Sequence, residues 1–150
     1  MVPDIGNIYV TLSYVSSRFW SDLTEDLKDP EFLGEFVRES IRISTIDRVV
    51  AQLDEAREAA GVSKAELARA LGAHAAAVRR LFSAEHVNPT LGTVAEVAGA
   101  LGLRVTLEPL GSEEGLVTSE PLLAGSSRDQ RAVAKQGVAM RCGRRTKLVS

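Results

Sequence analysis

The segment SKAELARALG at residues 63–72, followed directly by AHAAAVRRL at residues 73–81, decides the fold of this chain. Ser63 and Glu66 have the spacing of a capping box, which predicts a helix that begins directly after Ser63. Gly72 permits a sharp turn, because glycine adopts positive φ angles without steric cost. Val78 and Leu81 follow at helical spacing, so the segment predicts two short helices joined by a tight turn.

This pattern is typical of a helix-turn-helix, predicted here over residues 63–82, whose second helix lies in the major groove of DNA. Leu67 and Ala68 are expected to pack the first helix against the second, and alanine allows the two helices to cross closely. Residues 75–77 lie nearest the N-terminal end of the second helix, which is the end that meets base edges.

Further helices are predicted on both sides of the motif. Asp29 and Pro30 have the residue types of a helix cap and a first helical position, so one helix is expected to begin there. A second helix is expected from Ser44 or Thr45 to Ala60, and a helix after the motif is expected to begin at Thr90. The predicted fold class is mainly α, a compact bundle of about five helices that contains the helix-turn-helix.

Two segments alternate with the period of a β-strand. Residues 104–108 predict a short strand, whereas residues 8–15 predict either an N-terminal strand or part of a poorly ordered extension. The predicted domains are an N-terminal extension (1–28), a helical DNA-binding domain (29–110) and a flexible basic C-terminal tail (111–150). The tail is predicted from its composition, which is rich in Gly and Ser and then in Arg and Lys. Residues 129–140 could form a weak helix, but Gly137 and Gly143 disfavour a long one, so disorder is expected.

The charges are distributed unevenly along the 150 residues, although the net charge is only −2. Residues 1–110 contain 11 basic and 16 acidic residues, whereas residues 111–150 contain 7 basic and 4 acidic residues. This distribution indicates an acidic body with a basic tail. The final basic residues either add a non-specific contact to phosphates or serve only to keep the chain soluble.

The cysteine count and the hydropathy pattern favour a cytoplasmic protein. Cys142 is the single cysteine, so no disulfide can form within one chain, as is usual in a reducing compartment. No apolar run is as long as a membrane span, and the N-terminus lacks the basic leader of a signal peptide. We therefore expect a soluble, intracellular protein.

The chain lacks the residue patterns of a catalytic or metal site. Its two histidines, one cysteine and scattered carboxylates do not have the spacing of metal ligands. A glycine-rich phosphate loop and a nucleophile–base pair are also absent from the sequence. We therefore expect no metal, no cofactor and no enzymatic activity.

Residues 46–102 resemble a helix-turn-helix of the Cro/phage-repressor (XRE) type, and residues 27–110 resemble the HigA-type addiction-module antidotes, a family of antitoxins. The segments that carry the resemblance are Leu27-Lys28-Asp29-Pro30-Glu31-Phe32, residues 63–72, Asn88-Pro89-Thr90-Leu91 and Ala100-Leu101-Gly102-Leu103. The resemblance implies the antitoxin of a type II toxin–antitoxin system, which represses its own operon. Its implied partners are double-stranded operator DNA, a second copy of the chain in a homodimer, and a cognate toxin.

The resemblance also implies the residues that contact DNA. Residues at helix starts would bind phosphate, and residues on the second helix of the motif would face the bases, with His74 as the cap of that helix. The implied DNA-binding residues are Ser63, Lys64, His74, Ala75, Ala76, Ala77, Arg79, Arg80, Asn88 and Thr90.

The three adjacent alanines depart from what base recognition requires. Alanine offers a methyl group that can touch a thymine methyl, but it cannot form the hydrogen bonds that distinguish the bases. Arg79 and Arg80 are therefore the candidates for base contacts, although they could also be ordinary solvated residues, and His74 could act only as a cap. The alternative function is a protein-interaction module, either toxin-neutralising or an adaptor, with weak or lost sequence-specific DNA binding.

Overall fold

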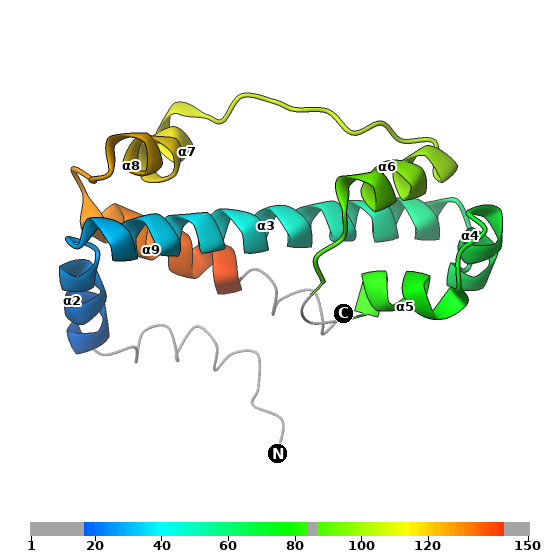
Figure 1. The fold of residues 1–150 in the computed structure, drawn as a ribbon, viewed down its shortest axis with the longest axis horizontal. Coiled ribbons are helices and arrows are strands. Elements are labelled where there is room, and N and C mark those ends of the chain that lie inside the picture. The colour runs from blue at the N-terminus through cyan, green and yellow to red at the C-terminus, as the bar shows by residue number, and fades with distance from the viewer. Residues whose placement is uncertain (1–16, 84–86, 143–150) are drawn as a thin grey trace, which may run out of the picture. The chain divides into compact units, whose positions relative to one another are not determined.

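The computed structural model describes residues 17–83 and 87–142. In these ranges the chain is helical and contains no strand, which confirms the predicted mainly α class. The helices, shown in Figure 1, are α2 (Ser17–Asp26), α3 (Pro30–Ala59), α4 (Lys64–Ala70), α5 (Ala75–Ser83), α6 (Leu91–Ala100), α7 (Ser112–Val117), α8 (Ser119–Ala124) and α9 (Gln130–Cys142).

The chain forms two compact units. The central unit consists of Arg42–Pro109, and the terminal unit combines Met1–Ile41 with Leu110–Ser150. Helix α3 begins in the terminal unit and ends in the central unit. This division differs from the predicted domains 1–28, 29–110 and 111–150, because the first part of α3 packs with α9 in the terminal unit.

Helix α3 is continuous where the sequence predicted two helices, so that prediction is wrong. Asp29 caps the helix as expected, since its Oδ1 accepts hydrogen bonds from the backbone N–H groups of Glu31 and Phe32 at 2.8 and 3.1 Å. The serines and threonine at 40–45 do not end the helix. Ser40 donates its hydroxyl to the Phe36 carbonyl at 2.7 Å, which satisfies the polar group inside the helix, and no glycine or proline interrupts this stretch.

The segment predicted as a flexible tail is helical through Cys142. Helix α9 buries Val133 and Ala134 (1% and 0% exposed) in a cluster formed with residues before and within the first part of α3. The other buried members of this cluster, the terminal core, are Leu27, Leu33, Phe36 and Val37. Burial of these apolar side chains stabilises a segment whose composition alone predicts disorder.

Gly137 brings α9 very close to α3. A Cβ atom at this position would lie 2.3 Å from Cε1 and 2.5 Å from Cζ of Phe36. Arg141, expected as part of a basic tail, instead places its guanidinium carbon 4.7 Å from the centre of the Phe36 ring. It also donates to Ser40 Oγ at 3.3 Å and to the Phe36 carbonyl at 3.4 Å, so this arginine connects α9 to α3.

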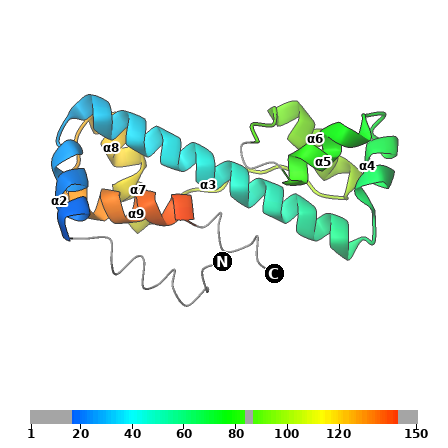
Figure 2. The same cartoon turned by 90° about the horizontal axis from the view of Figure 1, so that it is seen from below.

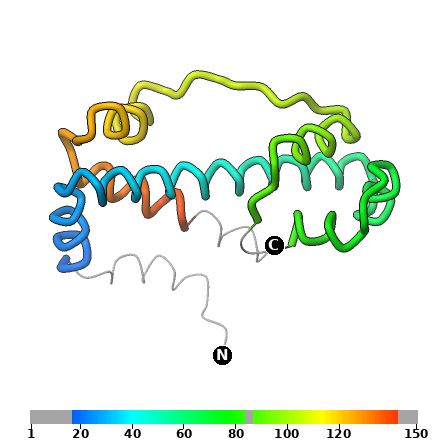
Figure 3. Tube along the Cα trace, in the orientation of Figure 1, coloured from blue at the N-terminus to red at the C-terminus, as the bar shows by residue number. Residues whose placement is uncertain are grey.

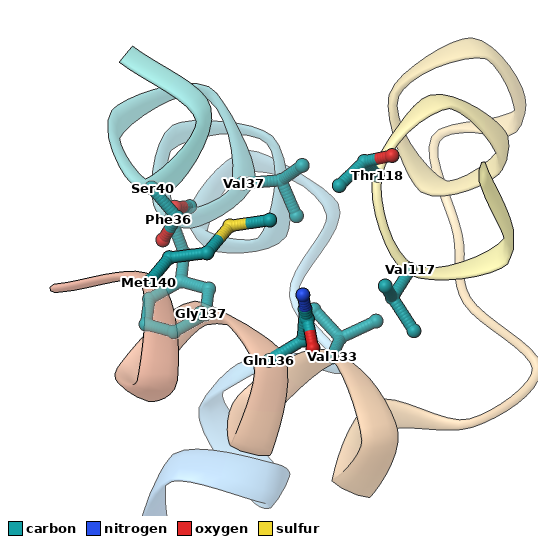
Figure 4. Close-up of a pocket in the computed structure, with 9 residues that line it drawn as sticks. All are labelled: Phe36, Val37, Ser40, Val117, Thr118, Val133, Gln136, Gly137 and Met140. Atoms are coloured by element: carbon teal, nitrogen blue, oxygen red, sulfur yellow. The ribbon is translucent and has the colours of Figure 1, made fainter. Parts of the chain in front are cut away.

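A small cavity lies beside this contact, between α3, α7 and α9 (Figure 4). Its volume of about 10 Å³ is at the limit for one water molecule. The residues that line it are Phe36, Val37, Ser40, Val117, Thr118, Val133, Gln136, Gly137 and Met140. The cavity is too small for an organic ligand, so it is a packing defect of the terminal core.

The predicted strand at 104–108 is wrong. Residues 103–110 are extended, as Figure 3 shows for the stretch between α6 and α7, but they belong to no sheet. Their alternating pattern favours extended backbone, whereas a strand requires a second strand to receive its hydrogen bonds, and none of the described residues supplies one. The other predicted strand, at residues 8–15, lies outside the described residues.

Candidate nucleic-acid interface

The core of the central unit fixes the geometry of α4 and α5. Leu67 and Ala68 of α4 are each 1% exposed, and Val78 and Leu81 of α5 are 4% and 5% exposed. These residues pack with Leu53 of α3 and with Val94, Val97 and Ala98 of α6. Figure 2 shows α4, α5 and α6 gathered about the C-terminal part of α3. The buried positions that the sequence predicts for Leu67, Ala68, Val78 and Leu81 are confirmed, whereas Leu91, which helical spacing also placed inward, is 72% exposed.

The turn between α4 and α5 depends on Gly72, whose φ of +62° lies in the left-handed region. Four residues separate α4 from α5, and the Ala73 N–H donates to the Ala68 carbonyl at 2.9 Å. This pattern is that of a helix ended by a left-handed glycine. The predicted role of the glycine is confirmed.

The start of α4 is held by the predicted capping box. Ser63 Oγ accepts from the Glu66 N–H at 3.1 Å, and Glu66 Oε2 accepts from the Ser63 N–H at 2.7 Å. The backbone and hydroxyl donors of Ser63 stabilise the carboxylate, so they hold the pKa of Glu66 below its ordinary value of 4.5. Ser63 is therefore the cap of α4, and the residue is exposed to solvent at the start of the helix.

Arg57 is a residue that the sequence analysis missed. It lies near the end of α3, with a side chain 12% exposed, pairs with Asp54 at 2.7 Å and donates to the Val62 carbonyl at 2.9 Å. These bonds tie α3 to the loop that precedes α4. The spacing of Asp54 and Arg57 on one helix face was a signal for the ion pair, but the sequence did not show the bond to the loop.

Two cations lie over the ring of Phe82 in α5. The Arg57 guanidinium carbon is 5.7 Å from the ring centre, and the Lys64 Nζ is 6.0 Å from it. Lys64, predicted as a phosphate contact, is half-buried and lies beside this ring. The aromatic face therefore positions a positive charge at the first turn of α4, next to α5.

The face of α5 opposite its buried residues is formed by Ala76, Arg79, Arg80 and Ser83. These residues are exposed, and helical spacing places Ala76 and Arg80 one turn apart, away from Val78 and Leu81. Ala75 and Ala77 are also exposed, at the two sides of this face. Among the described residues, neither arginine forms an ion pair, so both guanidinium groups are available to an external partner.

His74 lies at the start of α5, as predicted. Its carbonyl accepts from the N–H groups of Ala77 and Val78 at 2.9 and 3.3 Å, but its exposed imidazole forms no hydrogen bond with the described residues. The first turn of α5 thus lacks a side-chain cap. Its outermost backbone N–H groups point out of the helix end, where they can donate to an anion.

Asn88 and Thr90 precede α6 and are exposed. Thr90 is the cap of α6, because its Oγ1 accepts from the Thr93 N–H at 3.1 Å. Its hydroxyl is therefore engaged within the protein, which leaves the Asn88 side chain and the backbone of this loop as the groups that could contact phosphate.

Positive charge is concentrated on the motif. The central unit as a whole contains eight basic and eight acidic residues, whereas residues 63–83 contain four basic residues and only one acidic residue. The single carboxylate, Glu66, is bonded to the Ser63 N–H. The helix-turn-helix is thus a local positive patch on a unit without net charge, which suits a polyanion.

The described residues contain no group of three or more His, Cys, Asp or Glu side chains that could hold a metal ion. Across the same ranges, every helix is too short or too polar to span a membrane.

Residues 48–110 match the family model of a helix-turn-helix domain, which covers less than half of the chain. This match confirms the predicted helix-turn-helix and supports a DNA-binding regulator similar to the phage-repressor type. Residues 27–47, the first part of the stretch that resembles HigA-type antitoxins, lie outside the matched residues, and this finer resemblance is not confirmed. Comparison of the chain with curated proteins and with solved structures gives no match.

Proposed function

We propose that this chain is a cytoplasmic, non-enzymatic transcriptional regulator that binds operator DNA as a homodimer, with α5 in the major groove. The observation that carries the proposal is the outward face of α5, where Arg79 and Arg80 are exposed at the positive surface of the helix-turn-helix. Such a face can enter the groove, because its small alanines allow close approach and its arginines can donate hydrogen bonds.

Arg80 is the residue to which we assign base recognition. It shares the outermost face of α5 with Ala76, so it extends in the direction that the helix presents to DNA. An arginine contributes about 1–3 kcal/mol of discrimination when it bonds guanine with two hydrogen bonds. Because the alanines add little, the shape and deformability of the operator must supply part of the specificity.

Phosphate contacts are assigned to the helix starts around α5. Lys64 supplies a charge held beside Phe82, and the uncapped first turn of α5 supplies backbone N–H groups. These contacts position the protein on the duplex, and they weaken as salt increases because they release counterions.

We further propose that the regulator is the antitoxin of a type II toxin–antitoxin system that represses its own operon. The resemblance of residues 27–110 to HigA-type antitoxins supports this role. The terminal unit offers a surface outside the helix-turn-helix, and α2 exposes Asp22, Glu25 and Asp26 on it, which suits a basic toxin. A neighbouring gene for a small, basic, ribonuclease-like protein would support this assignment.

The alternative function is a protein-interaction module that has lost most sequence-specific DNA binding. The exposed methyl groups of Ala75, Ala76 and Ala77 favour this alternative, since they offer an apolar contact in place of hydrogen bonds. The two functions differ in whether the protein distinguishes its own upstream DNA from random DNA.

Fluorescence anisotropy with labelled duplexes tests the proposal. The wild-type protein should bind the region upstream of its own gene more tightly than random DNA at the same salt concentration. The Arg80→Ala variant should lose about 1–3 kcal/mol on the upstream DNA and little on random DNA, so that its specificity falls. Lys64→Ala should weaken binding to both duplexes by a similar factor.

Arg18→Ala is the matched control, because it removes one exposed charge from α2, outside the central unit. It should leave both affinities unchanged. If the wild-type protein shows no preference for its upstream region, operator binding is refuted and the interaction module is favoured. An equal loss on both duplexes for Arg80→Ala would instead refute the assignment of base recognition to this arginine.

A further inference from the structure

The extended segment after α6, residues 103–110, has the properties of a strand without a partner. Among the described residues, its only backbone bond is the Leu103 N–H to the Ala98 carbonyl at 2.7 Å. The N–H and C=O groups at 104–108 form no backbone hydrogen bond with the described residues. Leu103, Val105 and Leu107 alternate with polar residues and are 43%, 44% and 99% exposed. A row of unpaired backbone N–H and C=O groups on an extended segment is a template for pairing with another strand.

We propose that residues 104–108 pair with the same residues of a second copy of this chain, antiparallel, with Thr106 opposite Thr106 of the second copy. This interface is the surface on which the proposed homodimer rests. The register follows from the charges, because it places Arg104 opposite Glu108 of the second copy and Glu108 opposite its Arg104. Opposite charges on facing strand positions are stabilising, and like charges are destabilising.

The neighbouring registers do not pair Arg104 of one copy with Glu108 of the other. A two-fold axis at Val105 sets Glu108 opposite Gly102 of the second copy, and an axis at Leu107 sets Arg104 opposite Leu110. Odd shifts would set apolar residues opposite polar ones, because a slip by one residue exchanges the two faces of a strand. Only the axis at Thr106 pairs both charges and keeps the apolar residues on one face.

The same register agrees with the backbone. Pro109 lacks an N–H group, and the Leu103 N–H is already bonded to α6. In the proposed pairing these two residues face each other across the strands. If Thr106 forms a hydrogen-bonded pair with its copy, Arg104 and Glu108 form the next such pairs, and Leu103 with Pro109 falls at a position that needs no hydrogen bond.

The pairing also covers apolar surface. Val105 of one copy faces Leu107 of the second copy at a non-hydrogen-bonded position, where opposing side chains approach most closely. Leu107 is 99% exposed in one chain. In the paired dimer, the Leu107 of each copy gains Val105 of the other copy as an apolar neighbour. Burial of this side chain favours a copy of the same segment over a polar partner.

Charge exchange tests the register by sedimentation equilibrium. Arg104→Glu alone and Glu108→Arg alone each set like charges opposite one another twice per dimer, so the dimer dissociation constant should rise at least about tenfold. The variant that carries both substitutions should recover the wild-type constant. An equimolar mixture of the two single variants should form heterodimers, because every charge then meets its opposite.

Thr106→Pro tests the pairing itself, since it removes an N–H group at the centre of the ribbon and should abolish the dimer. Thr106→Val is the matched control, because it keeps the N–H group and favours strands. Circular dichroism should show unchanged helix content in both variants, since the segment lies outside the helices.

The inference rests on the proposed homodimer, but these measurements contain no DNA, so they succeed or fail separately from operator binding. A wild-type chain that is monomeric at all concentrations would overturn it. So would a dimer that persists in Thr106→Pro, or single charge variants that dimerise as well as the wild type and form no preferred heterodimer.

Discussion

The central and terminal units are both helical, but they bring together different parts of the chain. The central unit is one contiguous stretch, 42–109, in which neighbouring helices pack around leucines and valines. The terminal unit joins segments from both ends of the sequence, and the contact of α9 with α3 depends on Ala134 and Gly137, which have almost no side chain. Local sequence patterns predict contacts between neighbouring helices. They do not predict the packing of small residues that lie far apart in the sequence.

The core of the central unit and the terminal core share no buried residue. A large-to-small substitution in one core should therefore destabilise that unit more than the other. Leu67→Ala removes a side chain that is 1% exposed in the central core, and it should cost about 2–5 kcal/mol. Trp20, the single tryptophan, packs against the terminal core, so its fluorescence follows the terminal unit. Thermal unfolding of Leu67→Ala should therefore shift the circular dichroism more than the Trp20 signal.

Leu33→Ala is the matched variant in the terminal core, where Leu33 is also 1% exposed. It should shift the Trp20 transition more than the remaining helical signal. If both probes shift equally in both variants, the continuous α3 couples the units into one cooperative structure, and the contrast between them does not extend to stability.

Gly137→Ala tests the close packing that distinguishes the terminal unit. The added Cβ would meet the Phe36 ring at 2.3 Å, and overpacking of this kind costs about 1–3 kcal/mol, more than the roughly 1 kcal/mol that alanine contributes to a helix interior. The control is Gly99→Ala in α6, where a Cβ atom meets nothing within 4 Å. Chemical denaturation should show a loss of stability for Gly137→Ala and a gain for Gly99→Ala; a gain at both positions would contradict the close approach.

The smallest effect concerns the capping box of the central unit. Because the pKa of Glu66 is lowered in the folded state, the stabilisation by its carboxylate is present above the ordinary value of 4.5 and is lost as the pH falls through the folded value. Glu66→Gln keeps an oxygen acceptor but no longer titrates. The wild type should melt at a higher temperature than Glu66→Gln at neutral pH, and the difference should vanish in acid. A difference that is constant with pH would contradict the role of the charge.

Much of the central unit was predictable because its signals are local. Ser63, Gly72 and Thr90 each mark a helix boundary through their own chemistry, and the structure places a cap or a left-handed turn at each of them. The candidate DNA-binding residues on α5 came from the resemblance to helix-turn-helix proteins and from the apolar spacing of Val78 and Leu81, which leaves residues 75–77 and 79–80 outside the core. Their contacts with DNA remain predictions.

Other features could not be predicted because they depend on contacts made after the helices form. Ser44 and Thr45 predict the start of a second helix, but α3 continues through them, and the Ser40 hydroxyl bonds within the same helix. Arg57 gives no sign in the sequence that it bonds the loop before α4 and lies against Phe82. The segment at 104–108 has the alternation of a strand, but alternation does not supply a second strand.

The sequence by itself determined the helix-turn-helix, because caps, a left-handed glycine and apolar spacing act over a few residues and specify where helices start, stop and face the core. Only the tertiary structure decided the fate of residues 112–142. Gly115 and Gly137 lower the local preference for a helix, and the bonds from Arg141 to Ser40 and Phe36 span more than one hundred residues of chain. Such contacts stabilise a helix only when the distant segment that it packs against is already folded. A short stretch of sequence therefore cannot predict them.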